Sequence, residues 1–256
     1  MKTPIAVQLY SVREELERDF DGTLAQLAAM GYTAVETGEF AGEVRRQAEK
    51  FNEFGLQVVA AHVKPPVGER KERSLDFINA LGTNRLVVPW LDPEKYYHSA
   101  DDVLRAADLL NEAAENSRDS GLLFHYHNHD FEFGHINGRL VFDILQEKLD
   151  PSILFEIDTY WVQTAGIDAA DLVRQLGERA PLLHIKDGLL KRELPMVAVG
   201  EGQMSFEKVI PAGEPHTQWL IVELDSCAGD MMHAVARSYS YLSGFDPVPA
   251  LSLIHI

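Results

Sequence analysis

The chain has 256 residues, of which 46% are hydrophobic and 25% charged, a balance typical of a globular protein and not of a disordered one. Its 40 acidic residues exceed its 23 Lys and Arg residues, and the formal charge of −17 argues against nucleic-acid or anionic-membrane binding, which needs clustered basic side chains. The single cysteine, Cys227, excludes an internal disulfide framework and a cysteine-based zinc site.

Eight short apolar runs, rich in β-branched residues, predict eight β-strands. In chain order they are Pro4–Tyr10, Thr33–Thr37, Leu56–His62, Arg85–Trp90, Gly121–His127, Ile153–Asp158, Pro181–Lys186 and Gln218–Leu224. Successive runs begin 23 to 37 residues apart, which leaves room for a crossover helix in each interval and is too long for hairpins. Their near-continuous apolar character is typical of parallel strands that are covered on both faces.

Helical patterns with recognisable ends lie between these runs. Four glycines stand just past a helical pattern and before the next predicted strand, namely Gly31, Gly55, Gly82 and Gly121. Ser99, followed by two acidic residues, predicts the start of another helix, as does Asp168 ahead of an apolar stripe.

Eight strand–helix units without a linker predict a single (β/α)8 TIM barrel over residues 1–250. A doubly wound open sheet is the alternative, but Gln8-Leu9-Tyr10-Ser11 stands where that fold would carry a glycine-rich phosphate loop. The last six residues, 251–256, fit no helix or cap, and a transposon end used in sequencing libraries can encode them. We interpret them as a non-native tail.

The active sites of such barrels form at the carboxyl ends of the strands, so polar residues that close each run are the candidates. A single polar residue at a strand end is more often a salt-bridge partner or a helix cap. The prediction therefore depends on many such residues meeting at the same end of the barrel. Carboxylates and imidazoles are good ligands for divalent ions. The strand ends carry Gln8, Ser11, Glu36, His62, Trp90, His127, His129, Glu132, Asp158, His184, Lys186, Glu223 and Asp225.

The sequence resembles the xylose isomerase-like TIM-barrel proteins of the sugar phosphate isomerase/epimerase superfamily. Its relatives include D-tagatose 3-epimerase, inosose dehydratase and hydroxypyruvate isomerase. The motifs that carry the resemblance are YHNHDFEF (126–133), DTYW (158–161), HIKD (184–187) and GEG (200–202). The endonuclease branch of the superfamily is disfavoured, because Trp161 stands where that branch has a histidine.

The resemblance implies a divalent metal held by one residue from each of the last four strands. Asp158, His184 and Glu223 match three of these ligands. The epimerases carry the fourth, a glutamate, three residues before an asparagine, where this chain has His125. We predict that Glu132 replaces it. Mn²⁺ is the expected metal, with Mg²⁺, Co²⁺ or Zn²⁺ as alternatives.

The expected function is a metal-dependent sugar or keto-sugar isomerase or epimerase that abstracts a proton next to a carbonyl and passes through an enediolate. Glu132 and Glu223 are the expected acid and base, assisted by Lys186 and His127. The predicted substrate contacts are Tyr10, Glu36, His62, Trp90, His129 and Trp161. The long loop over residues 188–202 is a predicted lid.

Two other functions stay open, because the same carbanion can also expel a hydroxyl group. One is a keto-sugar or inosose-type dehydratase, and the other is a non-catalytic barrel that binds a sugar or a partner protein. The expected ligand is a small sugar or polyol, and no glycine-rich cradle supports a phosphorylated one. The N-terminus has no signal-peptide pattern, so we expect a cytoplasmic protein without membrane or nucleic-acid partners. A homo-oligomer is left open.

Overall fold

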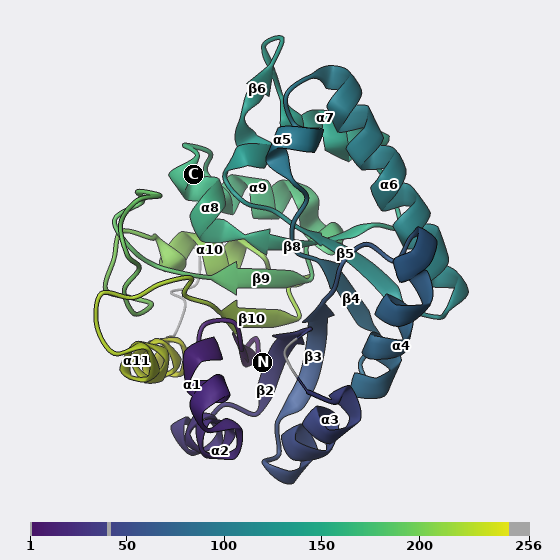
Figure 1. Ribbon diagram of the computed structural model, residues 1–256. Helices are drawn as coiled ribbons and strands as arrows, with labels where there is room; N and C mark the ends of the chain where they lie inside the picture. Colours follow the sequence, from purple (N-terminus) through teal and green to yellow (C-terminus); the bar gives the residue numbers. More distant parts are fainter. Residues whose placement is uncertain (1, 40–41, 246–256) are drawn as a thin grey trace.

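Eight parallel strands close into a barrel in the order β1-β10-β9-β8-β5-β4-β3-β2 (Figure 1). The computed structural model describes residues 2–39 and 42–245. The barrel strands are β1 (Ile5–Gln8), β2 (Ala34–Gly38), β3 (Gln57–His62), β4 (Arg85–Val88), β5 (Leu123–His127), β8 (Leu154–Asp158), β9 (Leu182–Ile185) and β10 (Trp219–Val222). Each coincides with one predicted run, which confirms the (β/α)8 barrel and rules out the open sheet.

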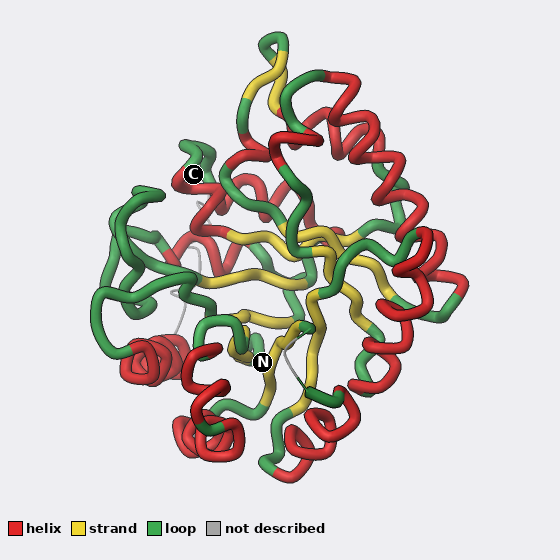
Figure 2. The backbone as a smooth tube through the Cα atoms, in the orientation of Figure 1, coloured by secondary structure: helices red, strands yellow, loops and turns green. Residues whose placement is uncertain are grey.

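The helices surround the barrel (Figure 2). They are α1 (Arg13–Arg18), α2 (Phe20–Met30), α3 (Val44–Glu53), α4 (Lys71–Leu81), α5 (Pro93–Tyr96), α6 (Ala100–Asp119), α7 (Val141–Lys148), α8 (Thr159–Thr164), α9 (Ala169–Leu176), α10 (Phe206–Ala212) and α11 (Met231–Gly244). Short 3₁₀ turns are η1 (Gly68–Arg70), η2 (Phe131–Phe133) and η3 (Gly177–Arg179). No helix in the described part of the chain is long and apolar enough to cross a membrane.

The predicted helix ends are confirmed where cap chemistry fixes them. Gly31 has a φ of 108° directly after α2, a left-handed conformation that only glycine adopts readily. The Ser99 hydroxyl accepts the Asp102 N–H at the start of α6, and the Asp168 carboxylate accepts the Asp171 N–H at the start of α9. The predicted tail at 251–256, like the boundary at 250, lies outside the described residues.

The sequence analysis did not predict the antiparallel hairpin of β6 (His135–Ile136) and β7 (Arg139–Leu140), which projects from the barrel between β5 and α7 (Figure 1). Its turn is Asn137-Gly138, and both residues have positive φ, 52° and 80°. An Asn-Gly pair is a strong hairpin signal, so the sequence does contain the information. The two strands are too short to show an alternating pattern.

Strand alternation places a polar ring above an apolar layer inside the barrel. Side chains two residues apart on a strand point to the same face. A buried cluster contains Ala6, Ala34, Val59, Ala60, Val87, Leu182 and Ile221. Five members of this cluster are each followed, two positions later in the chain, by a polar residue. These polar residues are Gln8, Glu36, His62, His184 and Glu223. The apolar layer closes the barrel beneath them, so these polar groups face the mouth at the carboxyl ends of the strands.

Candidate active site

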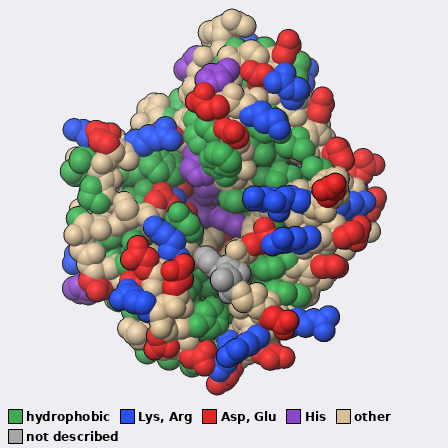
Figure 3. Space-filling model, viewed as in Figure 1, with side chains coloured by type: hydrophobic (Ala, Val, Ile, Leu, Met, Phe, Trp, Pro, Cys, Tyr) green, Lys and Arg blue, Asp and Glu red, His purple; other side chains and the backbone are tan. Residues whose placement is uncertain are grey.

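A cavity of about 710 Å³ opens at the carboxyl end of the barrel. Figure 3 shows this face hollowed at its centre, with histidine side chains inside the hollow. The residues that line it are Gln8, Tyr10, Arg13, Glu17, Gly38, Glu39, His62, Val63, Lys64, Pro89, Trp90, His127, His129, Lys186, Glu223 and Asp225. Cavities of about 650 and 620 Å³ beside α3 lie on the outside of the barrel, and no histidine stands among their described lining residues.

Four buried side chains from β5, β8, β9 and the end of β10 form a group whose ligand atoms all lie within 4.8 Å of one another. We call His127, Asp158, His184 and Glu223 the mouth group. His184 Nδ1 lies 2.7 Å from Glu223 Oε2, and His127 Nε2 lies 3.8 Å from Asp158 Oδ2. Two carboxylates and two imidazoles at this spacing are a donor set that suits a divalent ion.

Local structure explains how Asp158 presents one oxygen to this group. Its Oδ1 accepts the Trp161 N–H at 3.0 Å and so caps α8, which leaves Oδ2 to face His127 Nε2 and Lys186 Nζ. The Asn128 amide holds the strand end in place, since its Oδ1 accepts the Asp158 N–H at 3.0 Å. Burial raises the pKa of the Asp158 carboxyl to about 6, against the opposing effect of Lys186.

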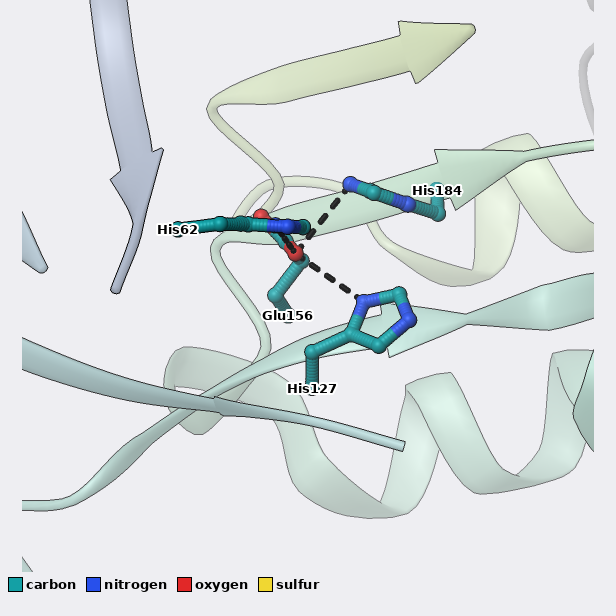
Figure 4. A group of neighbouring side chains, drawn as sticks. All are labelled: His62, His127, Glu156 and His184. Carbon is teal, nitrogen blue, oxygen red and sulfur yellow. Dashed lines mark hydrogen bonds and ion pairs between the residues drawn. The ribbon is translucent and has the colours of Figure 1, made fainter. Parts of the chain in front are cut away.

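A second group has one carboxylate oxygen among three imidazoles (Figure 4). We call His62, His127, Glu156 and His184 the inner group. Glu156 Oε2 lies 2.9 Å from His62 Nε2, 3.0 Å from His127 Nδ1 and 3.1 Å from His184 Nε2. Glu36 adds a further carboxylate, with its Oε2 2.6 Å from His184 Nε2 and 3.2 Å from His62 Nε2.

These carboxylates set the charge on the histidines. Burial alone would lower the pKa of His62, but Glu36 and Glu156 raise it to about 10, so its ring is a cation at neutral pH. The same two glutamates, with Glu223, raise the pKa of His184 well above its usual value despite burial. Burial lowers the pKa of His127, so that ring is neutral.

His127 and His184 belong to both groups and present a different ring nitrogen to each. His127 directs Nδ1 to Glu156 and Nε2 toward Asp158, while His184 directs Nε2 to Glu156 and Nδ1 to Glu223. A histidine that binds a metal through one nitrogen commonly donates the N–H of the other to a carboxylate, which fixes its tautomer and orientation. Glu156 is placed to do this for both rings.

Glu156 is the important residue that the sequence analysis missed. It lies inside the apolar run Ile153–Asp158, two residues before Asp158, and it is completely buried. A charged side chain inside a buried strand needs compensating partners, so its presence in that run was the available signal. A search restricted to strand ends does not find Glu156.

The Lys186 ammonium places a positive charge beside the two carboxylates of the mouth group. Its Nζ lies 2.9 Å from Asp158 Oδ2, 2.8 Å from Glu223 Oε2 and 3.0 Å from Asp225 Oδ1. Burial would lower the pKa of Lys186, but these three carboxylates raise it well above its usual value. Lys186 and His184 likewise hold the pKa of Glu223 well below its usual value despite burial. Both Lys186 and Glu223 are therefore ionised.

Glu132 lies outside both groups. β5 ends at His127, and the chain then turns into η2, where the Glu132 carboxylate accepts the Tyr126 hydroxyl at 2.5 Å and the His129 N–H at 2.8 Å. The geometry therefore gives no support to Glu132 as a metal ligand or as the acid or base. It holds the backbone of His129, whose ring lies flat on Phe131 with 5.2 Å between ring centroids.

The predicted substrate contacts fall into two sets. Tyr10, His62, Trp90 and His129 line the cavity. Glu36 is completely buried beneath it, and Trp161 is 8% exposed, with the Lys186 Nζ 5.7 Å from its ring centroid. These two residues support the groups that line the cavity. His125 lies on β5, two residues before His127. It is buried, and its Nδ1 lies 3.3 Å from the carbonyl oxygen of Leu86.

Glu132→Gln is expected to make stability less sensitive to pH. Burial raises the pKa of Glu132 to about 7, so the folded protein favours the protonated form. The stability from this proton is fully present below about pH 4.5 and is lost as pH rises through about 7. Urea unfolding at pH 5, 6 and 7 should show that the free energy of unfolding of the variant rises relative to that of the wild type as pH rises, by about 2 kcal/mol between pH 5 and pH 7. A constant difference across these pH values would contradict the assignment.

The loop after β9 is tied down by the buried carboxylate of Asp187. Asp187 accepts four backbone N–H groups, from Gly188 at 2.8 Å, Gly200 and Gly202 at 2.9 Å each, and Met204 at 3.1 Å. A Cβ on Gly202 would clash with this carboxylate. The predicted lid is therefore anchored at both of its ends. Its Arg192 also reaches Asp130 at 3.3 Å, on the loop that follows β5.

Asp187→Ala is expected to destabilise the fold by about 3 kcal/mol or more, because hydrogen bonds to a charged acceptor are the strong kind and several buried donors lose their partner. Asp168→Ala is the matched control, since the Asp168 carboxylate caps α9 through one N–H at an exposed site and should cost about 1 kcal/mol. Equal losses in urea unfolding would contradict the anchoring role of Asp187.

Comparisons with known proteins identify the fold. No protein-family model and no curated protein matched the sequence. Among solved structures, a sugar phosphate isomerase/epimerase from Parabacteroides distasonis is 22% identical, with a TM-score of 0.83 over 95% of this chain and 98% of that one. A probable 3-DHS dehydratase from Bacillus anthracis is 12% identical, with a TM-score of 0.75 over 96% and 100%. An L-ribulose 3-epimerase is 15% identical, with a TM-score of 0.69 over 95% and 94%. The predicted resemblance to xylose isomerase-like barrels is thus confirmed for the fold.

Proposed function

We propose that this protein is a divalent-metal-dependent isomerase or epimerase of a sugar or keto-sugar. The observation that carries the proposal is the mouth group, in which four buried metal-ligating side chains from four neighbouring strands meet at the end of the barrel where active sites form. The sugar isomerases and epimerases among the fold neighbours support the same class of reaction.

His127, Asp158, His184 and Glu223 would hold the metal. Their mixture of two imidazoles and two carboxylates suits Mn²⁺, with Mg²⁺, Co²⁺ and Zn²⁺ as alternatives. Held there, such an ion would supply Lewis-acid chemistry, which makes the C–H beside a carbonyl more acidic. In the interior, Glu156 and Glu36 keep the two ligand histidines oriented.

The chain supplies its own acids and bases around the cavity. Glu223 is ionised and lines the cavity, so its carboxylate is the candidate base for the proton next to the carbonyl. The His62 imidazolium also lines the cavity, at the end of β3, and is the candidate acid that returns a proton. The Lys186 ammonium lies between the carboxylates and is positioned to donate a hydrogen bond to a substrate oxygen.

Dehydration is the second candidate reaction. A proton donor in the same cavity as the base, such as His62, also suits the departure of a hydroxyl group as water. The probable 3-DHS dehydratase shares the fold over nearly its whole length. The two reactions differ in the fate of the carbanion, which is either reprotonated or expels the hydroxyl group β to the carbonyl as water.

The test is incubation of the Mn²⁺-loaded protein with a panel of keto-sugars in D₂O. Deuterium incorporation without loss of water supports isomerisation or epimerisation, and a new enone absorbance supports dehydration. Glu94→Gln, at an exposed site on α5, is the matched control for Glu223→Gln. If no exchange occurs with any substrate and no metal binds, the chain is a sugar- or partner-binding barrel and the proposal is wrong.

A further inference from the structure

The cavity at the barrel mouth has two dissimilar halves. The half formed by the ends of β5, β9 and β10 is polar and contains His127, His129, Lys186, Glu223 and Asp225. The half formed by β1 to β4 and the segments that follow them mixes two kinds of side chain. Tyr10, Val63, Pro89 and Trp90 are aromatic or apolar, and the polar lining residues beside them are Gln8, Arg13, Glu17, Glu39, His62 and Lys64. A ligand that fills both halves can therefore be polar at one end and pack an apolar group beside further polar contacts at the other.

Tyr10 and Trp90 leave a large apolar surface in contact with solvent. Trp90 is 50% exposed and Tyr10 is 45% exposed. Among the described residues six large hydrophobic side chains are at least 36% exposed, and the other four are leucines that do not line this cavity. Single exposed leucines are ordinary. Two exposed aromatic rings in one cavity indicate a binding surface.

The Tyr10 ring is held in place before any ligand binds. The Arg13 guanidinium lies 4.1 Å from the centroid of the Tyr10 ring and donates hydrogen bonds to the Tyr10 carbonyl at 2.7 Å and the Asp225 carbonyl at 3.2 Å. A ring fixed in this way loses little entropy when a ligand packs on it.

The size of the cavity also indicates a ligand larger than a single sugar. A volume of about 710 Å³ lies within the range of about 300–1,000 Å³ that accommodates drug-sized ligands, which are larger than a single sugar. A free monosaccharide on the polar half would leave the aromatic half in water. We propose that the substrate is a keto-sugar that carries an aromatic substituent, with the sugar on the polar half and the substituent packed on Tyr10 and Trp90. The sugar part of this assignment rests on the proposed function.

The test compares phenyl β-D-glucoside, methyl β-D-glucoside and cellobiose as ligands by calorimetry, with and without Mn²⁺. The phenyl compound is expected to bind about tenfold or more tightly than the methyl compound, because two aromatic contacts are added. Trp90→Ala and Tyr10→Ala should each remove most of this preference and leave the affinity for the methyl compound nearly unchanged. Leu104→Ala, at an exposed position on α6, is the matched control and should change neither affinity.

The outcomes separate this inference from the proposed function. If phenyl and methyl glucosides bind equally, or if Trp90→Ala weakens both equally, the aromatic subsite is overturned even when deuterium exchange is observed. If cellobiose binds as tightly as the phenyl compound, the aromatic half holds a second sugar and the substituent assignment is wrong. A phenyl preference without any metal binding or exchange would support the subsite and overturn only the proposed function.

Discussion

Glu223→Gln is expected to abolish metal-dependent turnover. The substitution removes the charge from the side chain whose Oε2 lies 2.7 Å from His184 Nδ1 and 2.8 Å from Lys186 Nζ. An amide is a poorer metal ligand than a carboxylate, and it cannot accept a proton at neutral pH. Loss of the base alone is expected to lower kcat by about 10²- to 10⁴-fold. Mn²⁺ affinity, measured by calorimetry, should fall by more than 100-fold, beyond the range of about 10- to 100-fold typical of residues that only orient ligands.

The control for this variant is Glu94→Gln, which removes an acidic charge from an exposed position and should retain full metal affinity and activity. Circular dichroism separates loss of function from loss of fold. Wild-type metal affinity in Glu223→Gln would remove this residue from the ligand set.

Glu156→Gln is the second variant with a large expected effect, although Glu156 is outside the mouth group. Its Oε2 contacts three imidazoles, and the loss of its charge weakens the contact that orients His127 and leaves His184 Nε2 with Glu36 as its only remaining carboxylate partner among the described residues. Mn²⁺ affinity is expected to fall by about 10- to 100-fold. The variant should also lower the pKa of His62 from about 10, because Glu156 is one of two carboxylates that raise it.

The His62 titration, followed by NMR, gives a readout that does not depend on turnover. The raised pKa of His62 contributes stability that is fully present below about pH 6.5 and is lost as pH rises through about 10, so Glu156→Gln should reduce this contribution at neutral pH. An unchanged His62 pKa together with unchanged metal affinity would contradict the assigned role. A larger loss of metal affinity in Glu156→Gln than in Glu223→Gln would instead place the ion in the inner group.

The sequence predicted the barrel because parallel strands covered on both faces appear as continuous apolar runs with a helix-length spacing. The rule that active sites lie at strand ends then located Asp158, which closes β8, His184, which lies one residue before the end of β9, and Glu223, which follows β10. His127 was assigned a catalytic role, whereas the structure places it among the candidate ligands. Its position at the end of β5 was nevertheless recognised.

The remaining features depended on three-dimensional information that the pattern does not carry. Glu156 is hidden inside a strand, and only the register that pairs it with His127 on β5 reveals its partners. Glu132 was assigned to the metal because its type and approximate position were right, but η2 turns its carboxylate toward Tyr126. The difference between the two halves of the cavity could not be predicted from the sequence, because each half is formed by strands that lie far apart in the chain.

The central claim is that a divalent ion binds among the mouth group. The most direct test is anomalous diffraction from crystals soaked in Mn²⁺. We predict one strong peak within about 2.0–2.6 Å of ligand atoms of His127, Asp158, His184 and Glu223. A peak centred among His62, Glu156 and the inner faces of the other two histidines, a peak at Glu132, or no peak at saturating Mn²⁺ would contradict the claim.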